Sequence, residues 1–205
     1  MTRLPSAPLA ALVAALCLFP ALASAQGTAR AFLEARHEEV NGILRDGATT
    51  DAARRQRTER LTRMLNDLLD YQALAEAALA DHWRSRSETE REQFVNLLRQ
   101  LVERNYETNL ERILEFEVSY DDERARGDRT VVTTSARSRT QRRQPPVEIE
   151  YTLRRDGRRW RVVDVTTDGV SMVRNYRDQF GRIIARDGWA ELIARMERRL
   201  EENRG

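Results

Sequence analysis

The spacing at which apolar residues recur changes twice along the chain, and this change limits the fold more than any other feature. Over residues 28–113 apolar side chains recur every three or four positions, which is typical of amphipathic helices. Over residues 116–165 they alternate with charged and polar side chains, which is typical of strands in a sheet covered on one face. The helical spacing returns after residue 170. Helices, then strands, then helices predict an α+β fold.

The boundaries of these elements carry their own signals. Ser87 and Glu90 have the spacing of a capping box, which predicts the start of a long helix with one apolar face. The Asp156-Gly157 pair predicts a tight hairpin between two of about four antiparallel strands. We therefore expect N-terminal and C-terminal helices to pack on one curved sheet, in a cone-like, NTF2-like arrangement with an apolar interior cavity.

Residues 1–25 have the composition of a cleaved export signal. An apolar run follows Arg3 and ends before Ala23–Ala25, which has the A-x-A pattern of a cleavage site. The run is shorter than the roughly 18 apolar residues that a membrane-spanning helix needs. We expect cleavage to leave residues 26–205 as a single soluble domain in an exported protein.

Charge is dense along the chain but nearly balanced. There are 35 basic residues, all of them arginine, against 33 acidic residues. A nucleic-acid-binding domain normally shows a basic stripe and a clear excess of positive charge, so we expect no nucleic-acid partner. Cys17, the one cysteine, lies in the expected export signal, so we expect no disulfide and no thiolate metal site in the mature chain.

Residues typical of catalytic or metal sites are few. The two histidines are His37 and His82, and neither has neighbours at metal-ligand spacing. His37 lies in a charged helix and is interpreted as a solvated side chain. The sequence contains no nucleophile elbow, P-loop or dinucleotide-binding fingerprint. We therefore expect no catalytic residue, no metal and no cofactor.

Asp164 is the charged residue that alternation places among apolar ones. Strict alternation puts it on the same strand face as Trp160 and Val162. A carboxylate buried there needs a partner, and pairing with an arginine or with backbone at the end of the strand is favoured. The alternative is a general base in a ligand cavity, which would make the protein a small-molecule isomerase or dehydratase with a cone-shaped fold.

A set of aromatic residues falls at helical or strand spacing, and two interpretations of it stay open. Aromatic residues so spaced usually form an ordinary core, as they would in a structural adaptor without a ligand. A helix-and-sheet cone can also leave a cavity that such residues line. The set is Tyr71, Trp83, Phe94, Tyr106, Phe116, Tyr151, Trp160, Tyr176 and Phe180.

Two segments resemble a known family. The run Trp160–Arg177, WRVVDVTTDGVSMVRNYR, continuing to Phe180 and Gly188, is similar to the signature of the MlaC family. The segments Asp81–Arg84 and Glu88–Phe94 resemble the central W-R…Q-R-x-x-F segment of that family. Its members are periplasmic phospholipid-binding proteins, also known as toluene-tolerance auxiliary transport components.

The resemblance implies a periplasmic phospholipid carrier that maintains outer-membrane lipid asymmetry. Such a carrier would move phospholipid between an outer-membrane lipoprotein–porin complex and an inner-membrane ABC transporter complex with an MCE-domain component. It would act as a monomer and without catalysis. Residues 26–58 carry no diagnostic part of the resemblance.

The resemblance also implies where the lipid lies. Acyl chains would be enclosed between the curved sheet and the helices, with the head group near the mouth. Without lysine in the chain, the expected head-group partners are Arg84, Arg174 and Arg177. The matching positions, together with two leucines on the long apolar helix face, give the expected lipid-binding set of Trp83, Phe94, Leu98, Leu101, Tyr106, Tyr151, Trp160, Val170, Val173, Tyr176 and Phe180.

Overall fold

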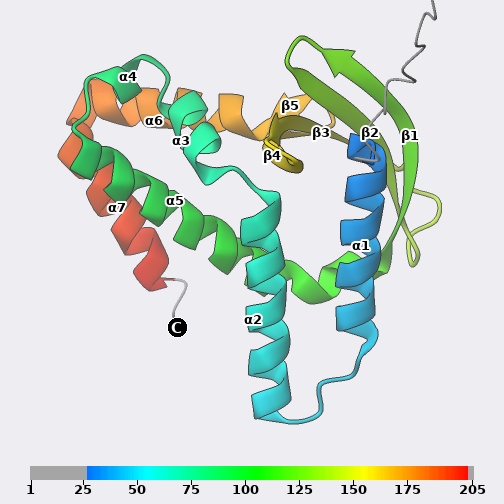
Figure 1. The fold of residues 1–205 in the computed structure, drawn as a ribbon. Helices are drawn as coiled ribbons and strands as arrows, with labels where there is room; N and C mark the ends of the chain where they lie inside the picture. Colours follow the sequence, from blue (N-terminus) through cyan, green and yellow to red (C-terminus); the bar gives the residue numbers. More distant parts are fainter. Residues whose placement is uncertain (1–26, 203–205) are drawn as a thin grey trace, which may run out of the picture.

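The computed structural model describes residues 27–202, apart from the side chains of residues 110 and 111. The expected export signal at residues 1–25 lies outside the described residues. Helices and one antiparallel sheet follow each other in the predicted order, which confirms the α+β class (Figure 1). No helix within residues 27–202 has the length and apolar character needed to cross a membrane.

The sheet has five antiparallel strands in the order β1-β2-β3-β4-β5. Gly127 and Gly157 have φ angles of 64° and 59° in the β1–β2 and β3–β4 turns, a region that glycine occupies at little cost. The predicted hairpin at Asp156 is thereby confirmed. The fifth strand adds to the four that alternation predicts, because two residues are too few to show a period. The strands are β1 (Phe116–Arg126), β2 (Arg129–Ser138), β3 (Val147–Asp156), β4 (Arg159–Thr167) and β5 (Val170–Ser171).

Side-chain caps fix where several helices begin. The hydroxyls of Thr28 and Ser171 and the carboxylate of Asp70 each accept a hydrogen bond from the backbone N–H three residues on. Ser87 and Glu90 form the predicted capping box, with N–H donors 2.8 and 3.3 Å from the partner oxygens. The helices are α1 (Ala29–Arg45), α2 (Asp51–Leu68), α3 (Tyr71–Leu79), α4 (Asp81–Arg84), α5 (Glu88–Asn109), the 3-10 helix η1 (Leu110–Glu115), α6 (Met172–Asp187) and α7 (Trp189–Glu202).

Helices α3, α5, α6 and α7 pack together beside the sheet (Figure 1). They share an aromatic core. Phe94 is fully buried, and its ring lies 5.5 Å from that of Phe180 and 5.8 Å from that of Trp189. Tyr176 stacks on Phe180 with 5.3 Å between the ring centroids. Each such buried side chain stabilises the fold by about 1.5–3 kcal/mol. These rings contact one another directly and form a packed core.

Helix α1 lies against the inner face of the sheet, which we define as the face that carries Leu153 and Val162 in the main core. The backbone N–H groups of Ala29 and Arg30 donate to the carboxylate of Glu123 on β1, at 3.2 and 3.1 Å. A carboxylate at this position is stabilised by the unpaired N–H groups and the dipole of the helix. The first turn of α1 is thereby attached to β1.

A bulge in β4 turns Asp164 to the opposite, outer face of the sheet. Val162 pairs with Leu153 and Asp164 pairs with Thr152, so Val163 is an extra residue between two paired positions. An extra residue reverses the alternation of side chains beyond it. The expectation that Asp164 shares a face with Val162 is therefore wrong, because it assumed a regular strand.

The Asp164 carboxylate caps α6. One oxygen accepts a hydrogen bond from the Ser171 hydroxyl at 2.6 Å, and the other accepts from the Val173 N–H at 3.1 Å. The expected pairing with backbone near the end of the strand is confirmed. Both carboxylate oxygens are engaged at the start of a helix, which does not favour the general-base interpretation.

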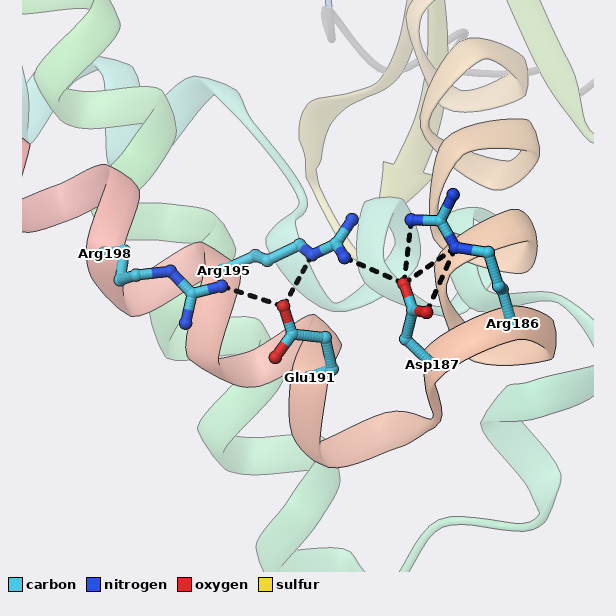
Figure 2. Close-up of polar contacts among 5 residues, drawn as sticks. All are labelled: Arg186, Asp187, Glu191, Arg195 and Arg198. Carbon is cyan, nitrogen blue, oxygen red and sulfur yellow. Dashed lines mark hydrogen bonds and ion pairs between the residues drawn. The ribbon is translucent and has the colours of Figure 1, made fainter.

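An ion network holds the corner between α6 and α7 (Figure 2). Asp187 accepts from Arg186 and Arg195 at 2.9 and 2.8 Å, and Glu191 accepts from Arg195 and Arg198 at 2.8 Å each. Hydrogen bonds from Arg186 and Arg195 lower the pKa of Asp187, and those from Arg195 and Arg198 lower the pKa of Glu191. Each of the three guanidinium groups at this corner is therefore bound to a carboxylate.

Candidate functional site

An apolar cavity of about 260 Å³ lies between α1 and the inner face of β1, β2 and β3. One residue of α2, one of α5 and one of η1 also line it. Most of the side chains that line it are aliphatic or aromatic, as expected for a site that takes an apolar ligand. The lining residues are Leu33, Arg36, His37, Val40, Leu68, Tyr106, Ile113, Phe116, Val118, Tyr120, Ala136, Ile149 and Tyr151.

Strand alternation and one small residue create this space. Phe116, Val118 and Tyr120 occupy every second position of β1, so all three side chains point to the inner face. Ala136 on β2 pairs with Val118, and its methyl group extends less far from the sheet than its neighbours. The short side chain leaves room between α1 and the sheet that the surrounding larger residues do not fill.

Three tyrosines contribute the phenol groups of the cavity. Burial is the main cause that raises the pKa of Tyr106 to about 12 and raises the pKa values of Tyr120 and Tyr151 above their ordinary range. All three phenols are therefore neutral at physiological pH. They add hydrogen-bonding groups to an apolar wall without adding charge.

Arg36 and His37 bring the polar nitrogen groups of the cavity, and the sequence interpretation missed both. The His37 ring meets the Tyr120 ring edge-on at 6.5 Å, and burial lowers the pKa of His37. Arg36 donates to Glu39 at 2.8 Å and lies over the Phe32 ring. The available signal was spacing, because His37 follows four residues after the apolar Leu33 on the same helix face.

No metal site accompanies His37. Among residues 27–202 there is no group of three or more histidine, cysteine, aspartate or glutamate side chains that could hold a metal ion. The imidazole is half-buried and lines the cavity, so the interpretation as a solvated side chain holds for only part of the ring.

Tyr106 and Tyr151 are the two predicted lipid-binding residues that line the cavity. Most of the others lie in the aromatic core between the helices, where they pack against one another. Their assignment to a lipid stays a prediction. This second group is Trp83, Phe94, Leu98, Leu101, Val173, Tyr176 and Phe180.

Trp160 packs against the main core without lining the cavity, and Val170 belongs to neither group. The Trp160 indole N–H donates to the carbonyl oxygen of Gly27 at 3.0 Å, and the Arg155 guanidinium lies over its ring at 4.5 Å. Trp160 thereby lines a separate cleft at the start of α1. Val170 is 62% exposed on β5.

The three predicted head-group arginines lie away from the apolar cavity. Arg84 is exposed at the end of α4. Arg174 and Arg177, on α6, face a polar cleft that shares no lining residue with the cavity. Arg36 is the guanidinium that lines the apolar space. The assignment of Arg84, Arg174 and Arg177 to a head group therefore stays a prediction.

Residues 34–198 match the model of a family described as MlaC protein. No curated protein sequence gave a significant match. A solved structure of a phospholipid-binding protein from Ralstonia solanacearum, in complex with a phospholipid, has a similar fold. The two chains are 18% identical with a TM-score of 0.70, over 87% of this chain and 100% of the other.

Proposed function

The chain belongs to the MlaC family, and we propose that it binds phospholipid and carries it, rather than catalysing a reaction. The observation that supports this most is the apolar cavity between α1 and the inner face of the sheet. The structural relative from Ralstonia solanacearum, in complex with a phospholipid, gives the proposal independent support. Acyl chains would enter between α1 and the three strands that face it.

The free energy of lipid in water explains why a protein carrier is needed. Each buried methylene contributes about 0.8 kcal/mol, so about 30 methylenes of a two-chain lipid amount to roughly 24 kcal/mol. A lipid that left a membrane without a carrier would lose nearly all of this favourable free energy. A carrier has to offer an apolar space of comparable quality, and the aliphatic and aromatic lining of the cavity has that character.

The size of the cavity bears on how a lipid enters. A dry cavity of about 150 Å³ holds one benzene molecule, so about 260 Å³ holds only part of an acyl chain. Two full chains would need more space, which a movement of α1 away from the sheet would provide. The contact of Glu123 with the first turn of α1 would resist that movement at one end of the helix.

The polar end of the lipid would lie near Arg36 and His37. A guanidinium can donate two parallel hydrogen bonds to a phosphate, and Arg36 is already oriented by Glu39. The neutral His37 ring and the tyrosine phenols would meet the glycerol ester groups, which are uncharged. In this arrangement the charged phosphate would meet the charged Arg36 guanidinium, and the acyl chains would contact the apolar wall.

We place the carrier in the periplasm, as a monomer. Residues 1–25 have the pattern of an export signal. By resemblance to the family, its partners are an outer-membrane lipoprotein–porin complex and an inner-membrane ABC transporter with an MCE-domain component. The transfer of phospholipid between them would maintain outer-membrane lipid asymmetry.

Mass spectrometry of the purified protein tests this function. The protein is exported in a bacterial host, purified without detergent and extracted with organic solvent. We expect phospholipid in the extract, and uptake of labelled lipid from phosphatidylglycerol vesicles by protein from which lipid has been removed. Absence of phospholipid from the extract together with no uptake from vesicles would refute the proposal.

A further inference from the structure

A second cleft, of about 540 Å³, lies on the outer face of the sheet where the β1–β2 turn meets the start of α6. Its most prominent feature is four arginines from two elements that are distant in sequence. Arg126 and Arg129 are register partners that flank the β1–β2 turn. Arg174 and Arg177 are three residues apart on α6, so their side chains share one face of the helix.

These guanidinium groups are incompletely paired. Within the described part of the chain, Arg126 and Arg174 make no side-chain hydrogen bond or ion pair. The nearest approach of Arg129 to a carboxylate is 3.9 Å, to Asp128. Arg177 donates from Nε to the carbonyl oxygen of Ala77 at 3.0 Å, which leaves its other N–H groups available. By contrast, the arginines at the α6–α7 corner are each bound to a carboxylate (Figure 2).

The carboxylates in the cleft do not cancel this charge. Asp164 is bound by the Ser171 hydroxyl and the Val173 N–H at the start of α6, and Asp128 lies on the turn itself. Two carboxylates face four guanidinium groups across the cleft. Like charges held together raise the affinity for an anion, because the anion relieves their repulsion.

The cleft and the apolar cavity lie on opposite faces of the sheet. Tyr151 on β3 lines the cavity, and its neighbour Thr152 lines the cleft. Consecutive strand residues point to opposite faces. The sheet therefore separates the cavity from the cleft, and the two share no lining residue.

We propose that this cleft binds a phosphate-bearing ligand, held by Arg126, Arg129, Arg174 and Arg177. The planar guanidinium forks match phosphate oxygens, and convergence from two elements lets one phosphate receive donors from both sides. The phosphate belongs to a free phosphate ester or to the head group of a lipid in a membrane surface. The site is distinct from the acyl cavity and does not depend on the carrier function.

Titration with glycerol 3-phosphate tests the site. Binding is measured by calorimetry and by NMR of the arginine Nε–H groups, at low salt. We expect saturable binding in which the Arg126 and Arg174 signals shift. The Arg126→Gln/Arg174→Gln variant should bind roughly tenfold more weakly or worse. The control, Arg55→Gln/Arg63→Gln, loses the same charge at two exposed positions of α2 outside the cleft and should change affinity less than about twofold.

The outcomes separate the possible sources of phosphate. If the cleft variant loses binding both to the ester and to phosphatidylglycerol vesicles, a membrane head group supplies the phosphate. If it loses only the ester, the ligand is a free phosphate ester. The inference is overturned if binding does not saturate or if the control variant weakens it equally. Oligoglutamate serves as an anionic ligand without phosphate. The proposal is also overturned if the cleft variant loses binding to oligoglutamate but keeps its binding to glycerol 3-phosphate. Arg126 and Arg174 are both exposed, so their replacement should not disturb the core. Thermal melting curves of the variants and the wild type check that all of them fold.

Discussion

The depth of the apolar cavity depends on Ala136, which has the smallest side chain of the residues that line it. It lies between Val118 and Val147 in the sheet and is 6% exposed. Ala136→Phe would place a ring in the space proposed for acyl chains. We expect lipid uptake from labelled vesicles to fall at least severalfold, while overpacking lowers stability by about 1–3 kcal/mol.

The matched control is Ala125→Phe, an exposed position on β1 that does not line the cavity. It adds the same ring to the same sheet. Uptake by this variant should equal that of the wild type. Equal uptake by both variants would mean that acyl chains bind elsewhere.

His37 makes the stability of the fold depend on pH. Burial lowers the pKa of its imidazole below the ordinary value of 6.5, so the unfolded chain binds this proton more tightly than the folded protein does. The contribution to stability is therefore present above pH 6.5 and is lost as the pH falls through the folded-state pKa.

An NMR titration of His37 should give a midpoint below 6.5, and His37→Gln should lose less stability than the wild type between pH 7 and pH 5. Urea unfolding at the two pH values measures that difference. A His37 midpoint at or above 6.5 would contradict the buried position of the ring.

At the scale of single elements, the sequence predicted the features that depend on neighbouring residues, such as helix caps and tight turns. The capping box at Ser87 and the turn at Gly157 depend on residues that are neighbours in sequence, and both were predicted correctly. The bulge at Val163 depends on how β4 pairs with β3 and then meets β5. Asp164 was therefore assigned to the wrong face, since no local pattern shows an extra residue in a strand.

The capping role of Asp164 gives a prediction about α6. Asp164→Ala leaves the Val173 N–H and the Ser171 hydroxyl without their acceptor, and we expect a loss of about 1–3 kcal/mol in urea unfolding. Adding Ser171→Ala should cost less than the sum of the two single changes, because the residues share one network. Asp178→Ala, an exposed change later in α6, should cost far less; an equal loss would remove Asp164 from a capping role.

At the scale of the whole molecule, the family and the cavity were visible in different parts of the chain. The motif from Trp160 to Arg177 identified the family, yet it lies at β4, β5 and the start of α6. The cavity forms where α1 meets β1, β2 and β3, and α1 lies in the segment that carried no diagnostic match. A sequence pattern can show that His37 shares a helix face with Leu33. It cannot show that this face stops short of the sheet and leaves a space.

This separation leaves two places where an apolar ligand could be sought. One is the cavity beside α1, and the other is the aromatic core around Phe94 and Phe180, where most of the predicted lipid-binding residues lie. The core rings contact one another, whereas the cavity holds unfilled space. We therefore propose that the acyl chains lie in the cavity.

Photo-crosslinking tests that assignment most directly. A phospholipid with a photoreactive group at the end of one acyl chain is loaded into the protein and irradiated, and the labelled peptides are mapped by mass spectrometry. We predict labels in α1 and in the strands that carry Tyr120 and Tyr151. Labels confined to the peptides around Phe94 and Phe180, with none in α1 or the sheet, would contradict the account.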